Sequence, residues 1–144
     1  MIVSQILKSK ADIGVISVKA DASVSEAVGI LSEKRIGTVV VSEDGASLDG
    51  ILSERDIVRE MGKRGVACLA EPVSAIMTAK LVTCSPEDTA DKVLEMMTIG
   101  RFRHLPVMDN GAMVGLISIG DVVKARLSEL SMEKDALQGM IMGH

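Results

Sequence analysis

Aromatic side chains are almost absent from this sequence of 144 residues, which has one Phe and no Trp or Tyr. A platform of stacked aromatic rings for single-stranded nucleic acid is therefore not expected. The formal net charge of −4 also disfavours a partner with a phosphate backbone, because such a partner requires a concentrated basic surface. We expect no nucleic-acid partner.

Cysteine is scarce as well. The two cysteines, Cys68 and Cys84, lack the CxxC spacing of a zinc site and are too few for a disulfide framework. No window approaches the roughly 18 consecutive apolar residues that cross a membrane, and the first residues lack the apolar run of a signal peptide. We therefore expect a cytoplasmic protein with reduced cysteines, no metal site and no membrane partner.

Groups that could perform catalysis are equally few. The sequence contains two histidines, His104 and His144, and neither a P-loop nor a GxGxxG pattern. No set of nucleophile, base and orienting acid can be assembled from these residues. We expect a protein that is not an enzyme and has no catalytic cofactor.

What the sequence does contain is an internal repeat. The segment GILSERD at 50–56 recurs as GLISIGD at 115–121, with Gly, Ser and Asp at the same places. Two copies are too few for a solenoid, and a unit of about sixty residues has only a marginal core by itself. We therefore expect two similar units that bury one face against each other.

Each copy has the hydrophobic pattern of a β-α-β-β-α unit, so the expected fold class is α+β. In the first copy, Ser23 and Glu26 form a capping box that begins a helix. In the second copy, the sequence predicts a strand at 80–83, a helix start at 85–88 and a hairpin turn at 109–111. The predicted organisation is a first repeat at 1–65, a linker at 66–79, a second repeat at 80–131 and a helical tail at 132–144.

The ordered set of motifs resembles a tandem pair of CBS (cystathionine β-synthase) domains. The likeness is carried by the two G-x-x-S-x-x-D segments, by IMT at 76–78 and by RHLPV at 103–107. It implies two βαββα repeats packed through their sheets around a pseudo-twofold axis. It also implies clefts that bind adenosine-containing ligands, such as AMP, ATP, S-adenosylmethionine or NAD, and a regulatory role toward a partner protein.

The Ser and Asp of the repeat are the central candidate site residues. A strand that ends at Ser118 places Asp121 in the first turn of a helix, near the positive end of the helix dipole. A carboxylate there can accept hydrogen bonds from the two hydroxyls of a ribose, as in dinucleotide folds. The resemblance implies this role for Asp121, and equally for Ser53 and Asp56. S-x-x-D is also the pattern of a plain capping box, so both interpretations remain open.

Basic residues distinguish the two copies. Arg103 and His104 precede a strand of the second copy, where the resemblance places groups near a ligand phosphate; the alternative is a solvated arginine and a structural histidine. The first copy has Gly37 and Thr38 at these positions. Arg55, at a helix start, indicates either a nearby anion or a salt bridge to a neighbouring glutamate. We therefore expect two unequal clefts, with the one holding the second-copy Ser and Asp better suited to phosphate.

The remaining expectations concern the ligand and the partners. The resemblance places the backbone near Val18 and Val82 beside the adenine of an AMP, ATP or NAD-type ligand. The alternative is a structural CBS pair without a physiological ligand. We expect an unidentified regulated protein and a homodimer, because a loose apolar stripe in the last helix would be left bare in a monomer. This stripe consists of Leu127, Leu130, Leu137 and Ile141.

Overall fold

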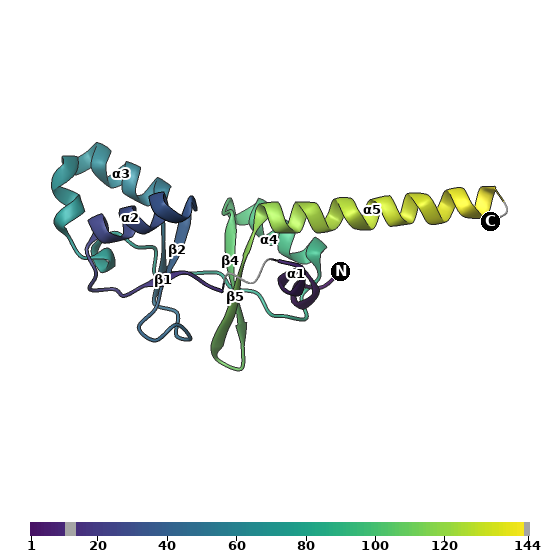
Figure 1. Cartoon of the computed structure of the whole chain (residues 1–144), viewed down its shortest axis with the longest axis horizontal. Helices are drawn as coiled ribbons and strands as arrows, with labels where there is room; N and C mark the ends of the chain where they lie inside the picture. The colour runs from purple at the N-terminus through teal and green to yellow at the C-terminus, as the bar shows by residue number, and fades with distance from the viewer. Residues whose placement is uncertain (11–13, 143–144) are drawn as a thin grey trace. The chain divides into compact units, whose positions relative to one another are not determined.

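The structure, a computed structural model, describes residues 1–10 and 14–142 and contains two compact units (Figure 1). Each unit has its own hydrophobic core. His144 lies outside the described residues. Unit 1 comprises Met1–Asp12, Thr83–Asp109 and Gly115–His144, and unit 2 comprises Ile13–Val82 and Asn110–Val114.

Unit 2 contains a three-stranded sheet in the order β1-β2-β3. The short strand β1 (Ser17–Val18) runs parallel to β2 (Thr38–Val41), and β3 (Gly50–Ser53) runs antiparallel to β2. All four residues of β2 are buried. A central strand that is buried on both faces has no polar alternation, which explains the sequence TVVV.

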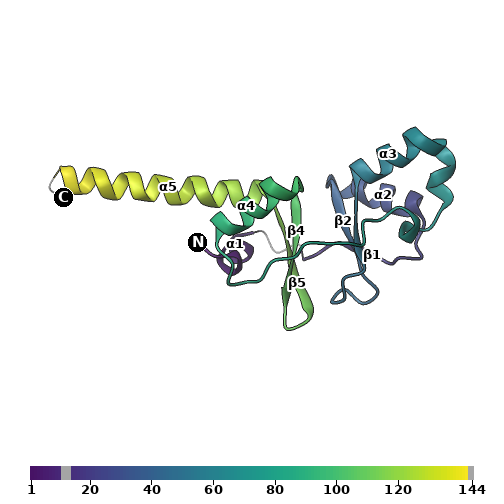
Figure 2. The ribbon, with the colours of Figure 1, turned by 180° about the vertical axis from the view of Figure 1, so that it is seen from behind.

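Two helices, α2 (Val24–Lys34) and α3 (Glu54–Arg64), lie on one side of this sheet (Figures 1 and 2). Helix α2 begins where the sequence predicts, because the Ser23 hydroxyl accepts a hydrogen bond from the Glu26 backbone N–H at 3.1 Å. Two short 3₁₀ helices, η1 (Gly65–Ala70) and η2 (Val73–Ala75), follow α3.

Unit 1 is built on a hairpin of β4 (His104–Asp109) and β5 (Ala112–Ser118). The predicted turn between them is present: Asn110 and Gly111 have φ values of 50° and 80°, the left-handed values that a tight hairpin turn requires. Three helices lie on one side of the hairpin (Figures 1 and 2). They are α1 (Val3–Ser9), α4 (Ala90–Gly100) and the first turns of α5 (Ile119–Ile141).

The two repeats exchange a short segment. Residues 3–10 (VSQILKSK) precede the first repeat in the chain but lie in unit 1 with the second repeat. Residues 73–80 (VSAIMTAK) precede the second repeat but lie in unit 2 with the first. The two segments share Val, Ser, Ile and Lys at the same places. Their Val and Ile are buried in the respective cores: Val3 and Ile6 in unit 1, and Val73 and Ile76 in unit 2.

This exchange changes the organisation predicted from the sequence. The N-terminal residues were assigned by chain order to the repeat at 1–65, but the described residues 1–10 belong to unit 1. The predicted linker at 66–79 is a folded part of unit 2, because its side chains Val73 and Ile76 belong to that core and Leu69 and Met77 pack against it. The residues of the predicted tail, as far as Ile141, continue α5 without a break.

The start of the second repeat also differs from the prediction. In the described part of the chain, residues 80–83 form no strand, and the pairing is a single parallel bridge between Cys84 and Val107. Helix α4 begins at Ala90 rather than at 85–88. Thr89 caps it by accepting the backbone N–H of Lys92 at 3.1 Å. The acidic residues before Thr89 instead close a turn, in which the Asp88 carboxylate accepts the Ser85 N–H at 2.8 Å.

Candidate functional site

The repeated Ser and Asp lie at the start of α3 and α5, directly after a strand. Ser53 is the N-cap of α3 and Ser118 is the N-cap of α5. In both, the Ser hydroxyl accepts the backbone N–H of the Asp, and the Asp carboxylate accepts the backbone N–H of the Ser. Both motifs are therefore complete capping boxes.

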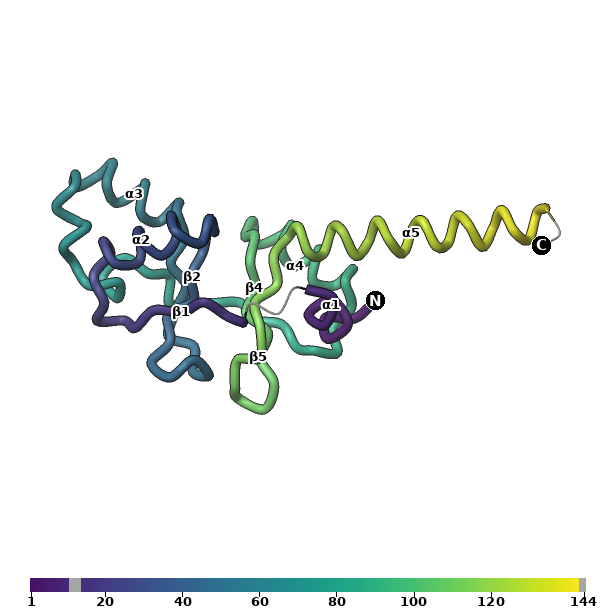
Figure 3. The backbone as a smooth tube through the Cα atoms, in the orientation of Figure 1, coloured from purple at the N-terminus to yellow at the C-terminus, as the bar shows by residue number. Residues whose placement is uncertain are grey.

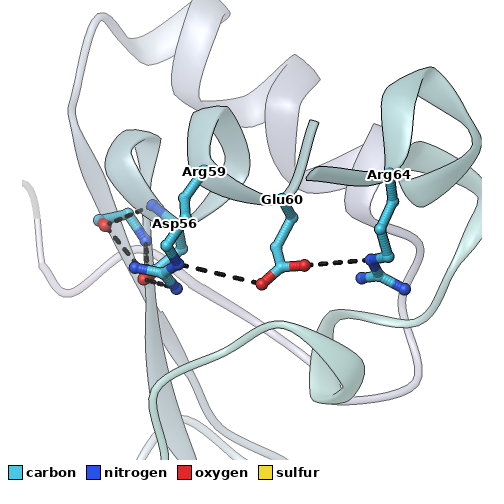
Figure 4. Close-up of polar contacts among 5 residues, drawn as sticks. Asp56, Arg59, Glu60 and Arg64 are labelled. Atoms are coloured by element: carbon cyan, nitrogen blue, oxygen red, sulfur yellow. Dashed lines mark hydrogen bonds and ion pairs between the residues drawn. The ribbon is translucent and has the colours of Figure 1, made fainter. Parts of the chain in front are cut away.

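In unit 2 the carboxylate of Asp56 is enclosed, and 9% of its side chain is exposed. Its Oδ2 accepts hydrogen bonds from both the N–H and the hydroxyl of Ser53 at 3.0 Å. Its Oδ1 accepts a hydrogen bond from Arg59, three residues along the same helix, at 2.9 Å (Figure 4). The row of ion pairs continues to Glu60 and Arg64. Both carboxylate oxygens of Asp56 are therefore used by groups close in sequence.

In unit 1 the carboxylate of Asp121 is more open, with 22% of its side chain exposed. Its Oδ2 accepts the N–H of Ser118 at 2.9 Å and lies 2.9 Å from the Nζ of Lys10. Lys10 also donates a hydrogen bond to the backbone oxygen of Leu116 at 3.0 Å. The Oδ1 atom of Asp121 takes part in none of these contacts. The cation beside Asp121 therefore comes from a distant part of the chain.

The charges around Asp121 influence one another. Burial raises the pKa of Asp121, but the hydrogen bonds from Lys10 and Ser118 and the charge of Lys10 outweigh it, so this pKa lies below its ordinary value. The pKa of His104 is lowered by burial and by the positive charges of Lys10 and Arg103, against the opposing effect of Asp121. At neutral pH the site therefore holds a carboxylate, a neutral imidazole and two cations.

The glycine that leads each motif makes room for the exchanged segment. A Cβ atom at Gly50 would lie 2.8 Å from the backbone oxygen of Thr78 and 2.8 Å from the sulfur of Met77. A Cβ atom at Gly115 would lie 2.9 Å from the two terminal methyl carbons of Leu7. Leu7 and Met77 occupy the same place in the two exchanged segments. The recurrence of glycine thus has a packing cause in both repeats.

The other predicted site residues fall into the two units as follows. Val18 is buried in the core of unit 2, and its carbonyl accepts the Ser42 N–H at 2.9 Å. This carbonyl therefore takes part in the pairing of β1 with β2. Val82 is 47% exposed and outside any strand.

The two arginines predicted to lie near a phosphate, Arg55 and Arg103, are exposed. Arg55 forms no ion pair in the described part of the chain, so the salt bridge to a glutamate, which was the alternative interpretation, is absent.

Lys10 is a candidate site residue that the sequence pattern did not indicate. Its partner Asp121 is 111 positions away, so no local pattern connects the two. The available signal was the match between 3–10 and 73–80, in which Lys10 corresponds to Lys80.

Among the residues that the structure describes, no group of three or more His, Cys, Asp or Glu is placed to hold a metal ion. No helix in this part of the chain is long and apolar enough to span a bilayer.

Comparison with known proteins agrees with this geometry. The CBS domain family matches this sequence twice, at residues 4–63 and 73–128. The chain belongs to the CBS domain family. It is 35% identical over 148 aligned residues to the mitochondrial CBS domain-containing protein CBSX3 of Arabidopsis thaliana, and the match covers 98% of this chain and 72% of the relative. The α+β fold predicted from the sequence is thereby confirmed.

Solved structures of CBS pairs have the same fold. The CBS domain-containing protein ATU1752 of Agrobacterium tumefaciens is 44% identical, with a TM-score of 0.82, and the match covers 88% of this chain and 99% of that one. The CBS pair of protein MJ0100, solved in complex with 5′-methylthioadenosine and S-adenosyl-L-methionine, is 23% identical with a TM-score of 0.76, over 90% and 98% of the two chains. Some curated relatives are far longer, and this chain spans 22–23% of their length.

Proposed function

We propose that this CBS pair is a regulatory module that binds an adenine nucleotide of the AMP, ATP or NAD type and transmits its binding to a partner protein. The observation that carries the proposal is the group around Asp121, where a carboxylate with 22% of its side chain exposed lies beside Lys10 and close to Arg103 and His104. A nucleotide needs both a hydrogen-bond acceptor for its ribose and cations for its phosphate. Unit 1 supplies both from neighbouring side chains.

The chemistry assigns each group a role. Oδ1 of Asp121 accepts hydrogen bonds from the ribose hydroxyls, and the Ser118 cap holds the carboxylate in place. Lys10 and Arg103 neutralise the phosphate; the guanidinium can do so with two parallel hydrogen bonds. His104 is neutral and can donate or accept one hydrogen bond, depending on its tautomer.

Unit 2 supplies the weaker ligand-binding position in this proposal. Ser53 and Asp56 occupy the same places as their counterparts in unit 1, but the Asp56 carboxylate already accepts three hydrogen bonds. A ribose would have to displace Arg59 to reach Oδ1 of Asp56. Arg55 is exposed beside it and supplies the cation for a phosphate, and the backbone near Val82 contacts the adenine.

The wider proposal is that of a cytoplasmic protein without enzymatic activity, which forms a homodimer and acts on an unidentified protein. Support for an adenosine-containing ligand comes from the MJ0100 complex, whose CBS pair binds two such molecules. That relative shares the fold of this chain, with a TM-score of 0.76.

Titration calorimetry with AMP, ADP, ATP and NAD tests the proposal. We expect at least one of them to bind, and its binding to raise the melting temperature, because a ligand that binds only the folded state stabilises it. Arg103→Ala should weaken AMP about 10- to 150-fold and leave adenosine unchanged, because a hydrogen bond to a charged group is worth about 1.5–3 kcal/mol. No heat and no stabilisation with any of the four at millimolar concentration would contradict the proposal.

A second candidate function is a structural CBS pair without a ligand. The specific observation in its favour is that Ser53–Asp56 and Ser118–Asp121 are complete capping boxes, which stabilise their helices without any ligand. In addition, each Asp already has a cation beside it. Binding of AMP that is lost in Asp121→Ala would exclude this function, because a plain cap makes no contact with a nucleotide.

A further inference from the structure

The second half of α5 has an apolar face that extends beyond the family match. The match to the CBS domain family ends at residue 128, whereas the helix continues to Ile141. Figure 3 shows this half of α5 extending past α1 and α4, the helices of unit 1 beside which it begins. Nothing in the repeat architecture accounts for these added turns.

The exposed face follows the pattern of a coiled coil. We name it the C-terminal seam; its residues are Leu127, Leu130, Lys134, Leu137 and Ile141, and they recur at alternating steps of three and four. This spacing keeps side chains on one face of a helix that packs against another helix. The four apolar side chains are 63%, 49%, 59% and 84% exposed, respectively. A run of this kind is an unpartnered surface rather than scattered exposure.

We propose that the C-terminal seam binds the same seam of a second copy of this chain in antiparallel orientation. This contact is independent of ligand binding. In an antiparallel pair, Leu127 of one copy lies against Leu137 of the other, so the apolar residues meet each other. Ile141 likewise lies against Val123 of the other copy. Val123 precedes Leu127 by four residues and is 40% exposed.

The single charged residue of the seam selects the orientation. A parallel pair would set Lys134 directly against Lys134 of the second copy, with two like charges in the contact. The antiparallel pair sets Lys134 against Leu130 of the second copy and beside its Glu133, so that the charges are complementary. A polar residue at such a position fixes the register of a coiled coil at some cost in affinity.

The length of the seam determines the expected strength. Its fifteen residues, 127–141, span about 22 Å, so the contact is small beside a standard interface of about 800 Å² per partner. Free peptides of this length scarcely form helices. Here the first turns of α5 are already fixed, because Val122 and Ala125 are buried in unit 1. Association therefore costs little additional conformational entropy, and we expect a dissociation constant in the micromolar range.

Analytical ultracentrifugation of the full chain over micromolar concentrations tests this contact. We expect the parent to approach twice its chain mass of 15.2 kDa, and Leu130→Glu/Leu137→Glu to dissociate at least 100-fold more readily. The matched control is Ser128→Glu/Ala136→Glu, which adds the same charge to exposed positions of α5 outside the seam and should associate like the parent. A parent that stays monomeric, or a seam variant that associates like the parent, would overturn the proposal.

Cross-linking tests the orientation. Ser131 lies beside the seam near the twofold axis of the antiparallel pair, so Ser131→Cys should be joined to its second copy by a short bis-maleimide. In a parallel pair the two Ser131 positions lie on opposite sides of the contact, where the reagent cannot join them. The native Cys68 and Cys84 are buried and stay unreacted, which the parent protein controls. Efficient joining through Leu130→Cys and none through Ser131→Cys would overturn the antiparallel arrangement.

Discussion

The two repeats use the same helix start but neutralise its carboxylate in opposite ways. In unit 2, Asp56 pairs with Arg59 of its own helix. In unit 1, the residue at the corresponding place of the helix is Lys124, which is exposed, and Asp121 pairs with Lys10 instead. Arg59 occupies Oδ1 of Asp56 from the same helix. Lys10 approaches Asp121 from a separate segment of the chain, and we therefore propose that unit 1 has the stronger binding.

The exchanged segments show the same contrast. Lys10 corresponds to Lys80, but the exposed Lys80 makes no ion pair in the described part of the chain. Arg59 already occupies the only carboxylate that Lys80 would otherwise approach by this correspondence. The two helices differ at the position three residues after the Asp, where α3 has Arg59 and α5 has Lys124. In the unit with Arg59, Lys80 forms no ion pair in the described part of the chain, whereas in the unit with Lys124, Lys10 pairs with the Asp carboxylate.

The largest expected effect concerns the glycines. Gly50→Ala should lower the free energy of unfolding by about 2–3 kcal/mol, because its Cβ meets the backbone oxygen of Thr78, which cannot move without distorting the strand pair. Gly115→Ala should cost about 1 kcal/mol, since it meets only the flexible end of Leu7. Urea unfolding of both variants measures the difference. An equal or larger cost at Gly115 would show that the exchanged segments pack differently from this account.

A smaller difference is expected for the two carboxylates. Asp56→Ala should destabilise the protein by about 2 kcal/mol, because it removes three hydrogen bonds from a nearly buried site. Asp121→Ala should cost about 1 kcal/mol, close to the value of an ordinary cap, because its site is more open. Denaturant titrations without ligand measure both values, and a larger loss at Asp121 would reverse the comparison.

Substitution of the two equivalent lysines, Lys10 and Lys80, distinguishes a cation that contacts the ligand from an ordinary surface charge. Lys10→Met should weaken AMP about 10-fold, because a charge that reaches the phosphate is lost. The same change should bind adenosine slightly more tightly, because it leaves Asp121 free for the ribose. Lys80→Met is the matched control and should change neither affinity. Equal weakening of AMP and adenosine in Lys10→Met would mean that Lys10 only maintains the fold.

The smallest effect is a dependence of stability on pH through His104. Because its pKa in the folded protein lies below the ordinary value of about 6.5, the unfolded chain binds a proton first as the pH falls. The free energy of unfolding should therefore decrease below about pH 6.5, by less than about 1.4 kcal/mol per pH unit. Thermal unfolding of the parent and of His104→Gln between about pH 7.5 and pH 5.5 measures this decrease. An identical slope in both proteins would show that His104 is not its source.

The sequence was sufficient for what depends on local pattern. The repeated G-x-x-S-x-x-D predicted both helix starts, and the Asn110-Gly111 turn was evident from the two residue types that accept positive φ. The predicted start of α4 at 85–88 was wrong, because Pro86 and the acidic residues near it are compatible both with the first turn of a helix and with a separate turn before the helix. Which of the two forms depends on the Thr89 cap three residues further on.

What depended on long-range packing could not be predicted from chain order. The assignment of residues 1–10 and 73–79 follows from which core buries Val3 and Val73, and both cores are apolar. The pairing of Asp121 with Lys10 depends on that same exchange. By contrast, Asp56 and Arg59 are three positions apart on one helix, so their ion pair can be predicted from their spacing in the sequence.

The most direct test of the central claim compares nucleotide binding by Asp121→Ala and Asp56→Ala in one calorimetric series with AMP and adenosine. We predict that Asp121→Ala weakens the tighter binding step about 10- to 150-fold for both ligands, because both carry the ribose. Asp56→Ala should leave that step unchanged. Circular dichroism confirms beforehand that both variants are folded. If Asp121→Ala binds AMP and adenosine as the parent does, Ser118 and Asp121 are only a helix cap, and the claim is contradicted.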